Sequence, residues 1–236
     1  MSSKIFVCAE AGHNGNGNMR LNKLIMKEAK ACGADAVKFQ LYDTNKIKRP
    51  WQSTYFELLF AELTKEDLIE LKAYADEIGI EFMASAFDTE RVRWLEEIGV
   101  KRHKLASRSI KDAETIKAME KTKKPIIASL GAWNDIVPPK IKNAQLLYCV
   151  AEYPAYITEE MFPSKFGEDE AYQGFSDHTI GMYWAREAVK RGATIIEKHF
   201  TISKDLPGKN QKGSCNPGEL KEFITYVRQI ERGISF

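Results

Sequence analysis

Two histidines, His178 and His199, stand near the ends of short apolar segments and are the side chains best suited to bind a metal. Neutral imidazole is a ligand for Mn, Fe, Co and Zn, and a site with two protein ligands leaves positions open for water and substrate. Glu197, two residues before His199, strengthens this interpretation. The pattern predicts a metal site. The alternative is that one histidine bonds to a backbone carbonyl while the other acts as an acid or base.

Lysines and serines near the ends of the apolar segments have the chemistry to bind an anion. They are Lys38, Lys104, Ser107, Ser129 and Ser176. Lysine supplies a point charge and the hydroxyls supply directional donors, so the set predicts a cradle for a phosphate and a carboxylate. No P-loop is present and no GxGxxG pattern follows a strand, so nucleotide binding has no support.

Polar residues end every apolar segment, which is costly unless they have partners or a function. The remaining ones are Glu10, Gln40, Ser85, Asp88, Tyr153, Asp177 and Lys198. A single buried serine or tyrosine is usually a satisfied structural group, but their repetition at one end of each segment favours an active site. The glycine-rich residues 11–18 predict either a loop that closes over this site or a plain turn.

Eight short apolar segments alternate with amphipathic helical patterns. The candidate strands span residues 5–12, 36–42, 81–87, 103–107, 125–131, 144–154, 174–179 and 193–201. Continuous apolar runs are typical of strands that are covered on both faces, as in a parallel sheet. The whole chain, residues 1–236, is therefore expected to form a single (β/α)₈ barrel, an α/β fold of the TIM type, with an open doubly wound sheet as the alternative.

The helical patterns between the strands have clear apolar faces and stop or start signals. The expected buried faces are Leu21, Leu24, Ile25 and Cys32 before Gly33; Leu68, Leu71, Ala75 and Ile78 before Gly79; and Leu220, Phe223, Ile224 and Val227 after Asn216–Pro217. In a barrel of this kind the active site lies at the carboxyl ends of the strands, where the polar residues occur.

The bulk composition is that of an ordinary globular protein. Hydrophobic residues make up 44% and charged residues 29%, and the net charge of +2 gives no reason to expect nucleic acid or membrane as a partner. The first residues have no apolar run or cleavage site, and no segment is long enough to span a membrane. Four cysteines without a paired spacing predict reduced thiols and a cytoplasmic protein.

With these residues placed, the chain resembles the sialic acid synthase family, which makes N-acylneuraminate-type nonulosonic acids. The matching stretches are AEAGHNGNGN, GADAVKFQ, SAFD, HKLAS, LLYCVAEYP, GFSDHTIG and GATIIEKHFT. They occur in the family's order and cover nearly the whole expected barrel. The stretches VKFQ, SDHT and EKHF are together specific to it.

The resemblance implies a transferase that condenses phosphoenolpyruvate with a sugar aldehyde. It implies a divalent metal on His178 and His199, typically Mn²⁺, with Mg²⁺, Co²⁺, Fe²⁺ and Zn²⁺ as alternatives. It places phosphoenolpyruvate on Lys38, Lys104, Ser107, Ser129 and Ser176. The acceptor sugar then faces Gln40, Tyr153 and Asn210, and Glu10 and Glu197 take part in the chemistry.

Some positions depart from the family pattern, mostly on the acceptor side. Gly15 replaces a usual histidine, Met161 a usual asparagine, and Asn210 and Gln211 stand where a PGPDH-like stretch supplies an aspartate. Family members usually carry a further C-terminal antifreeze-like domain that gives an arginine to the neighbouring subunit. This sequence ends at Phe236, so that contact is expected to be absent. The resemblance leaves the acceptor sugar and the oligomeric state open, a homo-oligomer included.

The expected mechanism uses the metal as a Lewis acid on the aldehyde oxygen, with Glu10 or Glu197 as general base for the water that adds at C2 of the donor. Two other functions compete. One is an aldolase that forms a Schiff base on Lys38, Lys104 or Lys198. The other is a catalytically impaired barrel that binds phosphoenolpyruvate without acceptor chemistry.

Overall fold

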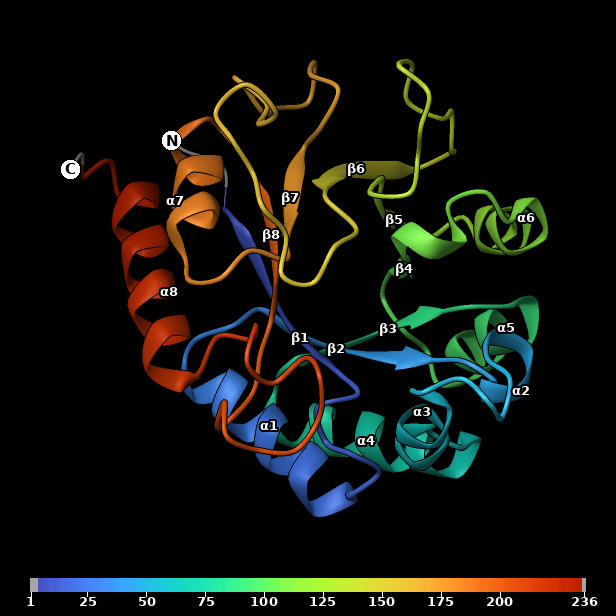
Figure 1. Cartoon of the computed structure of the whole chain (residues 1–236). Coiled ribbons are helices and arrows are strands. Elements are labelled where there is room, and N and C mark those ends of the chain that lie inside the picture. Colours follow the sequence, from blue (N-terminus) through green and yellow to red (C-terminus); the bar gives the residue numbers. More distant parts are fainter. Residues whose placement is uncertain (1–3, 235–236) are drawn as a thin grey trace.

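A closed barrel of eight parallel strands forms the centre of the protein (Figure 1). The computed structural model describes residues 4–234, so the ends of the expected domain, Met1 and Phe236, lie outside the described residues. The strands are β1 (Phe6–Gly12), β2 (Ala36–Leu41), β3 (Glu81–Ala86), β4 (His103–Leu105), β5 (Ile126–Ser129), β6 (Ala144–Cys149), β7 (Gly174–Asp177) and β8 (Ile195–His199). They follow one another in chain order and β8 pairs with β1, which confirms the (β/α)₈ class and rules out the open sheet.

Helices cover the outside of the barrel but are not distributed one per strand. They are α1 (Met19–Ala31), α2 (Thr44–Ile47), α3 (Tyr55–Ala61), α4 (Lys65–Ile78), α5 (Thr89–Glu97), the 3₁₀ turn η1 (Ser107–Ser109), α6 (Ala113–Lys121), α7 (Tyr183–Lys190) and α8 (Pro217–Glu231). Three helices follow β2, whereas residues 130–143 after β5 and 150–173 after β6 contain none, and Figure 1 shows both as loops. The expectation of a helix after every strand is wrong at these two connections.

The sixth strand is shorter than the sequence indicated. Its backbone pairs with β7 only from Leu147 to Cys149, and from Val150 onward the chain turns away. Tyr153 therefore lies on the connection after β6 instead of ending a strand. Residues 150–154 thus belong to the connection and not to the sheet, and Ala151, Glu152 and Tyr153 are exposed.

The buried face of α1 differs from the expected one. Leu24 is 41% exposed, whereas Asn22 and Ile25 are buried. Asn22 is turned inward because it packs against the turn after β1, where a Cβ atom added to Gly15 would lie 1.7 Å from the Asn22 side-chain oxygen. The two other expected faces are confirmed, and α8 begins at Pro217 with an Asn216 capping box as the sequence predicted.

Two layers of side chains fill the barrel. The lower layer is apolar and consists of Cys8, Ala36, Met83, Ile127, Leu147 and Ile195. Because side chains alternate along a strand, the next inward position lies two residues further toward the carboxyl end. At those positions the sequence places Glu10, Lys38, Ser85, Ser129, Cys149 and Glu197. The period of the strands thus sets a polar layer directly on an apolar floor.

Asp35, just before β2, connects the two ends of the described chain. Its Oδ2 accepts hydrogen bonds from the Val7 backbone N–H at 2.9 Å and from Arg228 of α8 at 2.7 Å, and its Oδ1 lies 2.6 Å from the Lys4 ammonium. Burial favours the neutral acid, but the bonds from Lys4, Val7 and Arg228 outweigh it and lower the pKa of Asp35. The carboxylate therefore stabilises the seam where α8 meets β1.

We expect Asp35→Asn to lower the free energy of unfolding at pH 7 by about 1.5–3 kcal/mol, the range for hydrogen bonds to a charged group. Since the folded pKa of Asp35 is depressed, its contribution is complete above the unfolded value of about 3.9 and is lost as the pH falls through the folded pKa. Urea denaturation from pH 7 to pH 3 should therefore show a gap between wild type and variant that closes on acidification. The exposed Asp205→Asn is the control, and a gap that stays constant with pH would contradict the assignment.

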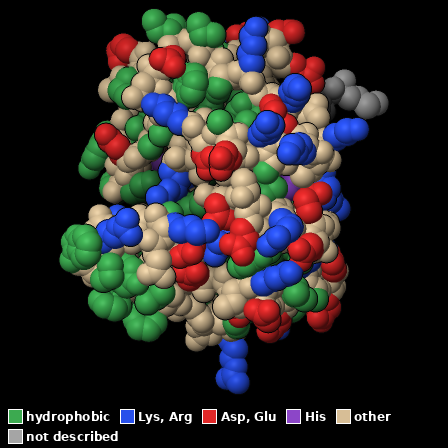
Figure 2. Space-filling view, turned by 90° about the vertical axis from the view of Figure 1, so that its right-hand side faces the viewer, with side chains coloured by type: hydrophobic (Ala, Val, Ile, Leu, Met, Phe, Trp, Pro, Cys, Tyr) green, Lys and Arg blue, Asp and Glu red, His purple; other side chains and the backbone are tan. Residues whose placement is uncertain are grey.

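The outer surface carries charges of both signs. Figure 2 shows Lys and Arg side chains interspersed with Asp and Glu over the face that it presents, which fits the small net charge. No helix among residues 4–234 is both long enough and apolar enough to span a bilayer. A group of buried charged side chains lies inside the barrel and not on this face.

Candidate active site

Seven polar side chains form a layer inside the barrel at the carboxyl ends of the strands, and we call them the polar layer. They are Glu10, Lys38, Ser85, Lys104, Ser129, Ser176 and Glu197, each at most 6% exposed. Charged groups at such depth are strongly destabilising unless they are paired and hydrogen-bonded. The contacts within the polar layer meet this requirement.

Glu197 of β8 lies at the centre of the polar layer. Its Oε1 is 3.6 Å from the Lys38 ammonium and 3.4 Å from the Lys104 ammonium, and it accepts a hydrogen bond from the Ser176 hydroxyl at 3.1 Å. Lys38 has a second carboxylate, Glu10, at 2.6 Å. The two lysines are thus balanced by two glutamates, and the polar layer has no net charge when all four groups are ionised.

Serine hydroxyls complete the bonding of both lysines. Lys38 donates to the Ser85 oxygen at 3.0 Å and Lys104 to the Ser129 oxygen at 2.6 Å. Each lysine comes from one strand and its serine from the next strand around the barrel, which holds both ammonium groups at fixed positions. A ligand anion would meet donors that are already oriented.

The two carboxyl groups of the polar layer are driven in opposite directions. Burial raises the pKa of Glu10 above its ordinary value, although Lys38 and the Gln40 amide, which donates at 3.0 Å, act against it. Burial acts in the same sense on Glu197, but Lys104 and Lys38 outweigh it and hold the pKa of that carboxyl below its ordinary value. Carboxyls with pKa values pushed apart are suited to different roles, one as a proton acceptor and one as a fixed anion.

The polar layer forms the bottom of a cavity of about 350 Å³. Every residue that the family resemblance assigns to the site lines this cavity: Glu10, Lys38, Gln40, Lys104, Ser107, Ser129, Tyr153, Ser176, His178, Glu197, His199 and Asn210. The geometric prediction, that residues far apart in the sequence meet at one end of the barrel, is confirmed. Their individual roles stay predictions.

His178 and His199 face each other across β7 and β8, with ring centroids 5.6 Å apart. His178 Nδ1 lies 2.7 Å from the Val150 carbonyl oxygen, which can only accept, so Nδ1 carries the proton. Nε2 of the same ring then accepts a hydrogen bond from the Tyr153 hydroxyl at 3.0 Å. The Tyr153 and His178 rings stack, with their centroids 4.1 Å apart. The carbonyl bond is the one that the non-metal alternative expected, and it also makes Nε2 the nitrogen that carries the lone pair.

His199 has the properties expected of a metal ligand. Its Nδ1 is buried and has no hydrogen-bond partner, and burial, with His178 and Lys38 nearby, puts its pKa well below the ordinary value. A neutral imidazole with an unpartnered nitrogen fits a divalent cation. No cluster of three or more His, Cys, Asp or Glu side chains that could hold a metal occurs in residues 4–234, so the protein itself would supply the two imidazoles alone.

Three polar residues that line the cavity have no role predicted from the sequence. Ser85 ended the third expected strand but was given no function, and its bond to Lys38 becomes visible only through the register of β2 and β3. His13 also lines the cavity, from the turn after β1. Arg108 carried no signal at all, because an arginine after a strand is ordinarily a solvated residue.

Other polar residues at the predicted strand ends lie outside the cavity. Lys198 points to the outside of the barrel, where its ammonium lies 2.8 Å from Asp177. Asp88 caps α5 by accepting from the Arg91 backbone N–H at 2.9 Å. His103, at the start of β4, does not line the cavity and is buried beside Glu96. Strand parity and helix capping explain these positions without a catalytic role.

The departures from the family pattern are mostly structural. Gln211 is fully buried and donates to the Asn14 carbonyl at 2.9 Å, while the Asn14 side chain donates to the Phe200 carbonyl at 2.9 Å. These bonds fix the residue 11–18 segment as an anchored turn instead of a loop free to close. Met161 is half-exposed and does not line the cavity. Asn210 is the departure that faces the site.

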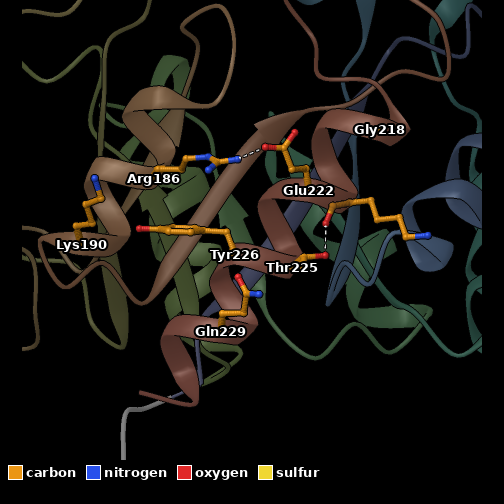
Figure 3. A pocket seen from close by; sticks show the side chains of 8 residues that line it. Arg186, Lys190, Gly218, Glu222, Thr225, Tyr226 and Gln229 are labelled. Atoms are coloured by element: carbon orange, nitrogen blue, oxygen red, sulfur yellow. Dashed lines mark hydrogen bonds and ion pairs between the residues drawn. The ribbon is translucent and has the colours of Figure 1, made fainter. Parts of the chain in front are cut away.

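A further hollow lies on the outer surface between α7 and α8, where Arg186 faces Tyr226 and pairs with Glu222 at 2.6 Å (Figure 3). Figure 3 shows its side chains spread along the two helices and not converging on one point. Its arginine is already neutralised by a carboxylate. We therefore assign ligand chemistry to the barrel cavity and not to this groove.

Comparison with known proteins identifies close relatives over nearly the whole chain. A family model described as the NeuB family matches residues 25–235. The N,N'-diacetyllegionaminic acid synthase of Legionella pneumophila is 35% identical over 98% of this chain and 73% of its own length. The human N-acetylneuraminate-9-phosphate synthase is 30% identical over 97% of this chain and 71% of its own length.

The fold comparison agrees. The crystal structure of the N-acetylneuraminic acid synthetase from Leptospira borgpetersenii superposes with a TM-score of 0.89, at 28% sequence identity, and covers 99% of this chain and 86% of that one. Sequence and structure thus point to the same group of proteins.

Proposed function

The chain belongs to the NeuB family, and on this premise we propose that it condenses phosphoenolpyruvate with a sugar aldehyde of the N-acetylmannosamine type to give a nonulosonic acid and phosphate. One observation supports this most directly. Two paired lysines, three serines and two imidazoles from β2, β4, β5, β7, β8 and the turn after β4 line a single cavity of about 350 Å³. That cavity joins an anion cradle to a site for a polarised aldehyde.

In this proposal, the lysines and serines bind the donor. Lys38 and Lys104 contact its charged oxygens, and the hydroxyls of Ser107, Ser129 and Ser176 supply directional donors. Held in this way, C3 of phosphoenolpyruvate points its double bond at the aldehyde carbon, and a C–C bond forms as the aldehyde oxygen takes up the electron pair and a proton. Gln40, Tyr153 and Asn210 would bind the acceptor on the other side of the cavity.

Glu10 is the better candidate for the general base. Water adds to C2 of the donor and must lose a proton, and an acceptor with a raised pKa holds that proton more readily than one with a lowered pKa. Glu10 has the raised pKa, whereas Glu197 is kept ionised by two lysines. The C2–O bond to phosphate then breaks, C2 becomes the ketone of the product, and phosphate leaves with the oxygen it brought.

A divalent cation, manganese first among the candidates, would be held by His178 and His199 and would polarise the aldehyde oxygen as a Lewis acid. The neutral state of His199 and the carbonyl bond that orients His178 both support this use of the two rings. Tyr153, which now donates to His178 Nε2, would turn toward the acceptor when that nitrogen binds another group.

The aldolase alternative is less compatible with the contacts of the lysines. Schiff-base formation requires a neutral amine. Burial lowers the pKa of Lys38, but the carboxylates of Glu10 and Glu197 outweigh it and raise that pKa above its ordinary value. Lys198 faces away from the cavity and is bonded to Asp177. We expect borohydride with pyruvate or a sugar aldehyde to leave the mass of the protein unchanged, and a trapped adduct on Lys38 or Lys104 would favour the aldolase.

The proposed reaction is tested by phosphate release from phosphoenolpyruvate with manganese and a panel of acceptors: N-acetylmannosamine, its 6-phosphate, other amino sugars and plain aldoses. Phosphate release that depends on one acceptor, with a product of the summed mass, is the expected result. In heavy-oxygen water the label should enter the sugar acid and not the phosphate, because the C–O bond breaks. Binding of the donor without turnover across the panel would instead favour the impaired barrel.

The cytoplasmic location and a homo-oligomeric state remain predictions. The four cysteines are all buried and unpaired, which supports a protein that does not rely on disulfides. Size-exclusion chromatography with light scattering gives the oligomeric state directly.

A further inference from the structure

The polar layer does not supply enough positive charge to neutralise phosphoenolpyruvate. Lys38 and Lys104 lie beside Glu10 and Glu197, so the two ammonium groups are already balanced by two carboxylates. A phosphate monoester carries a charge of about −1.5 to −2 near neutral pH, and the donor's carboxylate adds another. A ligand with nearly three negative charges therefore needs a cation beyond the two lysines.

Arg108 is a cation at the mouth of the cavity without a counter-charge. It follows Ser107 on η1, lines the cavity and remains exposed. Its guanidinium lies over the Phe87 ring at 5.0 Å, and it forms no hydrogen bond or ion pair with any residue from 4 to 234. Burial, the largest influence, lowers the pKa of Arg108, and the groups that act against it are the phenols of Tyr153 and Tyr42 and not a carboxylate.

The place of Arg108 in the barrel points to the donor and not to the aldehyde. It follows β4, which lies opposite β8 in the closed strand order, whereas His178 follows β7 and His199 ends β8. Ser107, the adjacent residue, accepts from the Gly131 backbone N–H at 3.1 Å. A Cβ atom at Gly131 would lie 3.0 Å from the Ser107 oxygen, so glycine keeps the space beside this hydroxyl open. Lys104 lies on β4, just before η1, so Lys104 and Arg108 form a cationic side of the cavity.

We propose that Arg108 binds the phosphate group of phosphoenolpyruvate, together with Ser107, and so supplies the positive charge that the paired lysines do not. The proposal rests on the proposed function. Guanidinium binds phosphate through two parallel hydrogen bonds, which a single ammonium cannot do. The face of Phe87 holds the side chain at the mouth before the ligand arrives, so Arg108 determines how tightly the donor binds and takes no part in bond making.

Arg108→Met tests this proposal, with Arg108→Lys as the conservative variant and the exposed Arg93→Met on α5 as the matched control. We expect the methionine variant to weaken binding of phosphoenolpyruvate, measured by calorimetry without acceptor, by about 10- to 100-fold. Inorganic phosphate should lose affinity in the same variant. The KM for the donor should rise while the KM for the acceptor stays within about threefold, and lysine should restore part of the loss.

The outcomes separate this proposal from the proposed function. If wild type turns over and Arg108→Met has an unchanged donor KM, Arg108 has no such role and the synthase assignment stands. A rise confined to the KM of a phosphorylated acceptor would move Arg108 to the acceptor side and overturn the proposal. If wild type binds neither phosphoenolpyruvate nor phosphate, both proposals fail. Arg108 is exposed, so the variants should fold, and their thermal melting curves check this.

Discussion

Glu10→Gln is expected to lower the turnover number for phosphate release by about 10²- to 10³-fold, the usual contribution of a positioned general base. Glutamine keeps the shape of the side chain and its hydrogen bonding but cannot accept the proton that the attacking water must lose. The KM for phosphoenolpyruvate should not rise, because Lys38 loses a competing carboxylate at 2.6 Å and is freer to bind the donor. Steady-state kinetics with saturating acceptor measure both quantities.

Glu197→Gln is the informative comparison for this prediction. Glu197 contacts both ammonium groups, so its loss disturbs donor binding and stability as well as rate. Glu77→Gln on the exposed face of α4 should change nothing and is the matched control. If Glu10→Gln retained full turnover while Glu197→Gln lost it, the roles of the two carboxyls would have to be exchanged.

His199→Ala is expected to remove most of the bound manganese and to lower turnover by at least about 10²-fold, since a Lewis acid contributes several kcal/mol to stabilising charge at an oxygen. His199 lines the cavity, and its buried Nδ1 has no hydrogen-bond partner. His178→Ala should have a similar effect. Metal content by emission spectroscopy, and activity before and after chelation and manganese addition, measure the two consequences separately.

His103→Gln is the matched control for the metal prediction. His103 is as buried as His199, but it lies beside Glu96 at 3.0 Å and does not line the cavity. It should keep both metal content and turnover, with any change confined to the melting temperature. If His199→Ala kept a full complement of manganese, or if chelation left wild-type activity unchanged, the cation would have to be removed from the proposed mechanism.

The sequence was sufficient to predict the barrel and the place of its site because both follow from the period of the strands. Cys8 and Glu10, or Ile195 and Glu197, stand two residues apart, and this spacing alone puts an apolar and a polar side chain on the same inner face. The pairing of each lysine could not be predicted. It depends on the register between strands, which brings Lys38 next to Glu10 only after the barrel has closed.

Predictions from local sequence patterns were wrong where tertiary contacts determine the structure. Leu24 fits an apolar stripe, yet α1 turns Asn22 inward, where its side chain packs closely against Gly15 of the neighbouring turn. Tyr153 was expected at the end of a strand, but β6 ends at Cys149, where its pairing with β7 stops. Arg108 was missed because its significance is the lack of an ion pair, and a missing partner becomes apparent only when all neighbours are known.

The apolar floor of the barrel also has a kinetic consequence. Met83, Ile127 and Ile195 are among the side chains that close the lower half of the barrel, so reactants and products share the mouth as their way in and out. Whichever substrate occupies the deeper position must arrive first, and the product left there must depart last. Because these apolar side chains close the lower end, the substrates would add in a compulsory order. In steady-state kinetics, one product would then inhibit competitively against one substrate alone.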